Sequence, residues 1–247
     1  MAEDSETRVF AAGSLRAPLI AIATDFGKTG RRSISFTFGP SGLLRDRIIA
    51  RGEAVDVFAS ANMEHPQWLT AKDWSSAALP FARNELCVLA AERVPITSAN
   101  VLDMLLDPRW KVGTSTPKLD PSGDYAWELF RRADALRPGA FSVLDSAARK
   151  LVGGPESPPS LANRSVYAML MVNGDADLFL TYRTNAQQAV NEVPTLTVVR
   201  LPDNLRIAAT YGLAVRTGSA ASAQAFADYV LSPAGQRTLA RFGFAPP

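Results

Sequence analysis

The feature that most constrains the fold of this chain is a regular alternation of strand-like and helix-like stretches before residue 115. Short apolar or alternating runs at 8–12, 33–38 and 54–60 predict strands. Residues 15–27 and 43–49, which lie between them, carry apolar side chains at helical spacing. Because strand–helix–strand repetition joins parallel strands, the pattern predicts an α/β fold in which helices flank a mainly parallel sheet.

The rest of the chain continues this alternation and indicates a second lobe. We expect the chain to leave the first lobe near 82–86 and to return near 208–212, which makes the first lobe discontinuous. Lobe 1 then contains residues 1–83 and 211–247, lobe 2 contains residues 84–210, and a ligand cleft lies between them. The later predicted elements are strands at 84–91, 111–114, 176–181, 196–200 and 207–215, helices at 63–71, 96–106, 124–133, 164–173, 219–231 and 233–242, and a loop at 153–160.

Charge and composition disfavour several classes of function. Lys and Arg number 26, Asp and Glu number 24, and the basic residues are scattered, which does not suit a nucleic-acid-binding surface. No run of about 18 apolar residues is present to span a membrane. The single cysteine, Cys87, and the single histidine, His65, cannot build a Cys/His zinc site. We expect Cys87 to be a buried apolar side chain and His65 to lie on the surface.

Three strand-to-helix junctions place a serine where a helix is predicted to begin. They are Ala12-Gly13-Ser14-Leu15, Gly39-Pro40-Ser41-Gly42-Leu43 and Asp120-Pro121-Ser122-Gly123. A helix start carries unpaired backbone N–H groups and a partial positive charge, and small residues there let an anion approach. Each serine alone is also an ordinary helix cap. Three such junctions in one α/β chain favour an anion site beyond the carboxyl ends of the strands.

These segments resemble the molybdate-binding proteins of ABC importers, and the resemblance covers nearly the whole chain in order. The matching segments are Ala11–Leu15, Phe38–Ile48, Gly52–Asn62, Asp120–Ala126, Asn173–Tyr182, Ser232–Gln236 and Phe242–Phe244. The resemblance implies a two-lobed periplasmic-binding-protein fold. It further implies a monomeric, non-enzymatic receptor that needs no cofactor, binds molybdate or tungstate with high affinity and delivers it to an ABC permease. It also implies a periplasmic location, with the signal peptide removed from this sequence.

The resemblance implies a set of ligand-binding residues. Hydroxyl donors would come from Ser14, Ser41, Ser122 and Tyr182, joined by the backbone N–H of Gly42. A further contact would come from the backbone at the helix start around Asn163-Arg164, and the side chain of Arg164 could offset charge. Asp120 resembles an aspartate of the tungstate/molybdate-binding branch whose carboxylate can coordinate the metal centre of the oxyanion. The alternative for Asp120 is a helix cap, and the alternative for Arg164 is a solvated side chain.

Three other functions stay open at this point. A receptor of the same fold could take sulfate, a phosphonate or a small carboxylate. A serine hydrolase would need a base near its nucleophile, but His65 is the only histidine and no Gly-x-Ser-x-Gly motif is present. An effector-sensing domain of a transcription regulator would share the fold, but we expect no helix-turn-helix before the first strand.

Overall fold

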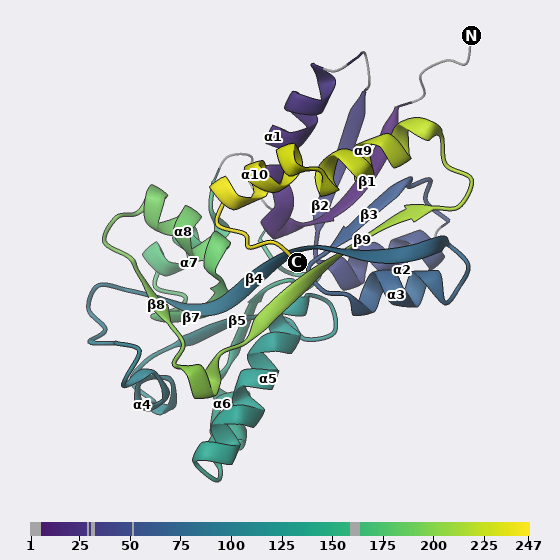
Figure 1. The fold of residues 1–247 in the computed structure, drawn as a ribbon. Coiled ribbons are helices and arrows are strands. Elements are labelled where there is room, and N and C mark those ends of the chain that lie inside the picture. The colour runs from purple at the N-terminus through teal and green to yellow at the C-terminus, as the bar shows by residue number, and fades with distance from the viewer. Residues whose placement is uncertain (1–5, 29, 31–32, 51, 159–163) are drawn as a thin grey trace. The chain divides into compact units, whose positions relative to one another are not determined.

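The computed structural model describes residues 6–28, 30, 33–50, 52–158 and 164–247. The chain divides into two compact units, of which unit 1 contains Met1–Asn84 and Ala209–Pro247 and unit 2 contains Glu85–Ala208. The chain enters unit 2 within strand β4 (Ser75–Ala90) and leaves it at the start of β9 (Ala208–Arg216), as Figure 1 traces. The predicted lobe boundaries differ from these limits by one residue at the first crossing and by two at the second.

The sheet of unit 1 is built around β1 (Thr7–Ala12). This strand pairs in parallel with both β2 (Ile34–Gly39) and β3 (Val57–Ser60). The returning strand β9 pairs with β3 in the antiparallel direction. Because the parallel strands β1, β2 and β3 share one direction, their carboxyl ends lie at the same edge of the sheet.

Helices cover both faces of the unit 1 sheet (Figure 1). On one face, α1 (Arg16–Gly27) packs against α9 (Ala221–Leu231) and α10 (Pro233–Arg241), with the rings of Phe26 and Phe226 5.6 Å apart. On the other face, α2 (Ser41–Ala50) contacts α3 (Glu64–Thr70). The core beneath α2 and α3 contains Phe10, Leu44, Ile48, Val55, Phe58 and Leu69.

The sheet of unit 2 is centred on β5 (Val112–Ser115) and β7 (Leu178–Tyr182), which are parallel to each other. Strand β6 (Arg149–Val152) is also parallel to β5, whereas β4 runs antiparallel to β7 and to β8 (Thr197–Arg200). The helices of this unit are α4 (Val101–Leu106), α5 (Pro121–Leu136), α6 (Ala140–Ala147), α7 (Val166–Val172) and α8 (Arg183–Glu192). Helix α5 buries Ala126, Leu129, Phe130 and Ala133, whose spacing of three and four residues places them on one face.

The α/β class is confirmed, and most strands of each unit share one direction. The sheets are mixed because β4 and β9, which carry the chain between the units, run antiparallel to their neighbours. The strand predicted at 84–91 begins earlier, at Ser75. The helix predicted over 96–106 is confined to Val101–Leu106, because Asn100 accepts hydrogen bonds from the backbone and hydroxyl of Thr97 and holds a turn there. Helices α6 and α8 and strand β6 were not predicted.

Two single-residue predictions have opposite outcomes. Cys87 is buried, as expected, and burial raises the pKa of its thiol to about 12. The prediction that His65 lies on the surface is wrong, because its side chain packs in α3 and only 3% of the residue is exposed. Among the described residues, no helix is both long enough and apolar enough to cross a bilayer.

Candidate functional site

The candidate ligand residues of unit 1 lie at the carboxyl edge of its parallel strands. Ser14 follows the end of β1, and Ser41 follows the end of β2. Because the register pairs Ala12 with Gly39, these two strand ends are neighbours in the sheet. Ligands of α/β proteins collect at this edge. Strand β3 ends beside them at Ser60.

Ser14 is held by a tyrosine that the sequence analysis did not identify. Its hydroxyl oxygen lies 2.9 Å from the hydroxyl of Tyr211, which is buried in β9. The side-chain amide of Asn84 donates to the same tyrosine oxygen at 3.3 Å. This arrangement lets Tyr211 donate to Ser14, so that Ser14 can donate its own proton to a bound oxygen.

Ser41 is fully buried at the first position of α2. Its hydroxyl oxygen accepts a hydrogen bond from the backbone N–H of Ala61 at 3.1 Å. A hydroxyl that accepts in this way still has a proton to donate. Gly42 is the next residue of the helix and is also buried, so its N–H belongs to the first turn, where backbone donors lack intrahelical partners.

A polar cluster continues from this point into α3. Ser60 donates to the side-chain oxygen of Asn62 at 2.9 Å, and the backbone N–H of His65 donates to the same oxygen at 3.2 Å. A guanidinium nitrogen of Arg45 lies 3.2 Å from Nδ1 of His65. Arginine can only donate, so Nδ1 accepts and the ring proton is on Nε2. Burial, assisted by the charge of Arg45, lowers the pKa of His65 to about 4.

The candidate ligand residues of unit 2 lie at the start of α5, just beyond β5. Asp120 is the N-cap residue, and its carboxylate accepts from the backbone N–H of Ser122 and from the hydroxyl of Ser115, both at 3.0 Å. The geometry therefore shows that Asp120 caps helix α5. A Cβ on Gly123 would lie 2.6 Å from backbone atoms of Thr116 and Pro117, so this close turn requires glycine.

Ser122 differs from the other serines because its hydroxyl has no hydrogen-bond partner among the described residues. Only 1% of the residue is exposed. Buried hydroxyl groups are nearly always paired, and an unpaired one costs about 1–3 kcal/mol. The hydroxyl lies in the first turn of a 16-residue helix, where the helix dipole favours negative charge. This position is suited to an anionic hydrogen-bond acceptor.

The electrostatic environment of Asp120 is unfavourable to its charge. Burial raises the pKa of its carboxyl, the nearby Asp124 raises it further, and the hydrogen bonds from Ser122 and Ser115 offset part of the rise. The hydroxyl of Tyr167 forms a hydrogen bond with Ser115. It also accepts a hydrogen bond from the side-chain amide of Asn185 at 3.1 Å. Burial, and then the charge of Asp120, raise the pKa of Tyr167. Sequence reasoning did not identify this cluster.

The structure places the two remaining predicted residues differently. Tyr182 is buried at the carboxyl end of β7, and its ring packs edge-on against Tyr125 with centroids 6.3 Å apart. Since β7 and β5 are parallel, Tyr182 and Ser115 end strands of the same sheet in the same direction. Arg164 is exposed, and its guanidinium pairs with Glu192 at 2.5 Å. Asn163 lies outside the described residues.

The predicted residues are divided between the two units. Ser14, Ser41 and Gly42 belong to unit 1, and Asp120, Ser122 and Tyr182 belong to unit 2. Arg164 is engaged elsewhere on unit 2. The described residues contain no group of three or more His, Cys, Asp or Glu side chains that could hold a metal ion.

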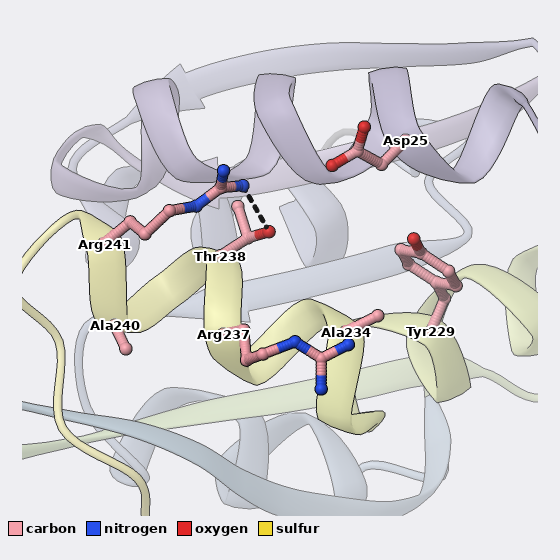
Figure 2. Close-up of a pocket in the computed structure, with 7 residues that line it drawn as sticks. All are labelled: Asp25, Tyr229, Ala234, Arg237, Thr238, Ala240 and Arg241. Carbon is pink, nitrogen blue, oxygen red and sulfur yellow. Dashed lines mark hydrogen bonds between the residues drawn. The ribbon is translucent and has the colours of Figure 1, made fainter.

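A surface pocket of about 620 Å³ lies elsewhere on unit 1, among α1, α9 and α10. Figure 2 shows Arg237 and Arg241 on one helix and Asp25 on another, with Arg241 donating to Thr238 at 3.0 Å. The pocket contains none of the predicted ligand residues. Its two arginines are exposed, whereas Ser41 and Ser122 at the strand ends are buried.

Comparison with known proteins identifies the family. The family profile of bacterial extracellular solute-binding proteins matches residues 7–245. The chain belongs to this family. It is 37% identical over 242 residues to an uncharacterized protein of Pasteurella multocida, covering 97% of this chain and 98% of that protein. It is 26% identical over 253 residues to the molybdate-binding protein ModA of Escherichia coli, covering 99% and 90% of the two chains.

One solved structure with the same fold is named for a different ligand, sulfate. The sulfate-binding protein SubI of Mycobacterium tuberculosis superposes with a TM-score of 0.77 at 19% identity, covering 98% of this chain and 87% of that one. At this identity the likeness shows the fold alone. The family and the α/β architecture are therefore established, and the ligand has to be argued from the site.

Proposed function

We propose that this solute-binding protein binds a tetrahedral oxyanion, molybdate or tungstate, as a monomer in the periplasm and delivers it to an ABC permease. The proposed donors are the hydroxyls of Ser14, Ser41, Ser122 and Tyr182 and the backbone N–H of Gly42. The proposal involves no chemical step and no cofactor. The resemblance of the binding segments and the molybdate-binding relative of E. coli support the choice of ion.

The observation that carries the proposal is the buried hydroxyl of Ser122. It has no partner among the described residues and lies in the first turn of α5. A buried donor at such a position is satisfied by an oxyanion, which supplies an acceptor and a negative charge together. Ser14 and Ser41 are placed at the corresponding strand ends of unit 1, where each hydroxyl can donate.

The donors that we propose are neutral, which suits a site that must also release its ligand. Charge-assisted hydrogen bonds from fixed hydroxyl and amide groups are about twice as strong as neutral ones. We leave the guanidinium group of Arg164 out of the proposed set, because its charge is already paired with Glu192.

A second candidate is a sulfate receptor, because the sulfate-binding protein SubI has the same fold. Sulfate and molybdate offer the same arrangement of four acceptor oxygens. Selectivity between them then depends on how closely the donors approach, since the metal–oxygen distance exceeds the sulfur–oxygen distance.

Thermal unfolding in the presence of molybdate, tungstate or sulfate tests the proposal. A ligand at one hundred times its Kd adds about 2.7 kcal/mol to the free energy of unfolding and raises Tm accordingly. We expect a strong rise with molybdate and tungstate and a smaller one with sulfate. A rise with sulfate alone would favour the second candidate, and the absence of any rise would contradict oxyanion binding. Ser146→Ala, an exposed serine of α6, is the matched control for the site serines.

A further inference from the structure

We propose that the site at the start of α5 binds its oxyanion together with one proton, which is shared between the carboxyl group of Asp120 and a ligand oxygen. This inference rests on the proposed function. It makes Asp120 a binding residue that selects for the protonation state of the complex.

The first step of the argument is proximity. The carboxylate of Asp120 accepts from the backbone N–H of Ser122 at 3.0 Å. The unpaired hydroxyl that we assign to the ligand belongs to the same serine. A ligand oxygen that accepts from that hydroxyl would therefore bind at the residue whose backbone N–H is already bonded to the carboxyl group of Asp120.

The second step concerns the charges around Asp120. From β5, the hydroxyl of Ser115 donates to its carboxylate, and from α7 the neutral phenol of Tyr167 lies behind Ser115. From α5 itself, Asp124 contributes a second negative charge, and Gly153 of the loop after β6 packs closely against Asp120 without a charge. Among the described residues, none of the groups bonded to the carboxyl of Asp120 is a cation.

The third step is the energetic consequence. An ionised carboxylate and a dianion in adjacent positions repel each other strongly where water is excluded. Two such groups share one proton, so that the pair loses one negative charge, as close carboxylates do. Burial already raises the pKa of Asp120 before a ligand binds, so its carboxyl group is suited to take the added proton.

The proton can be described in two equivalent ways. A neutral Asp120 donates its O–H to a fully ionised oxyanion, or an ionised Asp120 accepts from an oxyanion that carries its own proton. Both descriptions contain the same atoms, and the proton comes from solvent. A carboxylate that instead coordinated the metal centre would stay ionised and would take up no proton.

Isothermal titration calorimetry with sodium molybdate tests this inference. Titrations in two buffers of different ionisation enthalpy, repeated between pH 7 and pH 9.5, give the number of protons taken up per ligand bound. We expect uptake that approaches one proton over part of this range, with affinity falling by up to about tenfold per pH unit there. Sodium sulfate, whose sulfur cannot accept a carboxylate ligand, should show the same coupling.

Two variants make the test specific. Asp120→Asn keeps an oxygen that can cap α5 but removes the acid, so proton uptake should vanish and the affinity should become independent of pH. Asp124→Asn is the matched control, since it removes the neighbouring carboxylate, which accepts from the backbone N–H of Lys118. The control should still take up a proton, over a pH range shifted downward, because Asp124 no longer raises the pKa of Asp120.

The outcomes separate the two proposals. If the wild type binds molybdate or sulfate with less than about 0.2 proton at every pH, the proton inference is wrong while the proposed function stands. Uptake that persists in Asp120→Asn would also contradict it. If neither anion binds the wild type, the proposed function itself fails.

Discussion

The serines of the two units occupy the same kind of junction but have different surroundings. In unit 1, Ser14 contacts the hydroxyl of Tyr211 and Ser41 accepts from the backbone of Ala61. In unit 2, the hydroxyl of Ser122 has no partner among the described residues and a partly buried acid lies beside it. The hydroxyls of unit 1 are thus held by the protein itself, whereas we propose that the hydroxyl of Ser122 is paired by a ligand.

This difference separates stability from binding. A serine that is bonded within the protein contributes to the fold before any ligand is present. An unpaired buried serine costs free energy in the empty protein and recovers it when a ligand is bound. Unit 1 should therefore be sensitive to substitution in stability measurements, and the Ser122 position should be sensitive chiefly in affinity measurements.

The largest expected effect on the free energy of unfolding distinguishes Gly123, next to Ser122, from Gly13, next to Ser14. Gly123→Ala should lower the free energy of unfolding by about 3 kcal/mol, because the new methyl group would lie 2.6 Å from backbone atoms. Gly13→Ala should change it by less than about 0.5 kcal/mol, because nothing lies within 4 Å of the new Cβ. Urea unfolding of both variants measures this contrast. Equal losses would show that the two junctions are packed alike.

The next effect concerns pH and the cluster beside Ser41. His65 has a pKa of about 4 in the folded protein, against about 6.5 unfolded, so the unfolded chain binds more protons between these values. Stability is complete above pH 6.5 and falls as the pH falls toward 4. The loss between pH 7 and pH 5 should be about 2 kcal/mol larger in the wild type than in His65→Gln. Urea unfolding at pH 7 and at pH 5 measures this loss of stability in both proteins. If the wild type and His65→Gln lose the same free energy of unfolding, His65 is not a buried neutral histidine.

The smallest stability effect compares the serines directly. Ser41→Ala should destabilise the ligand-free protein by about 1 kcal/mol, because the hydrogen bond from Ala61 is lost. Ser122→Ala should be neutral or stabilising by up to about 1 kcal/mol, because it removes an unpaired buried hydroxyl. Thermal unfolding without ligand distinguishes the two, and a larger loss in Ser122→Ala would reverse the comparison between the units.

Sequence patterns predicted most of the fold because its elements have strong periodicity. Strands β1, β2 and β3 and the amphipathic α5 were predicted within a few residues. Helix α8 was missed because its buried face consists of small or polar side chains, Asn185, Ala186 and Ala189, which give no apolar stripe. The antiparallel direction of β4 and β9 could not be predicted, because strand direction at the crossings depends on contacts between distant segments.

The site was predictable where its residues share a local motif. The Asp120-Pro-Ser-Gly segment indicated both a cap and a ligand group, and the structure shows the cap. The partners Tyr211 and Tyr167 could not be found, since they lie far along the chain from Ser14 and Ser115. The prediction for His65 was wrong because Arg45, which pairs with it, comes from another helix.

The most direct test of the central claim is the affinity for molybdate of Ser122→Ala and of the wild type, measured by isothermal titration calorimetry. A hydrogen bond to a charged group contributes about 1.5–3 kcal/mol. We therefore predict that Kd rises by about tenfold or more in Ser122→Ala, while the Tm of the ligand-free variant is unchanged or higher. An unchanged Kd would contradict the assignment of the buried Ser122 hydroxyl to the bound oxyanion.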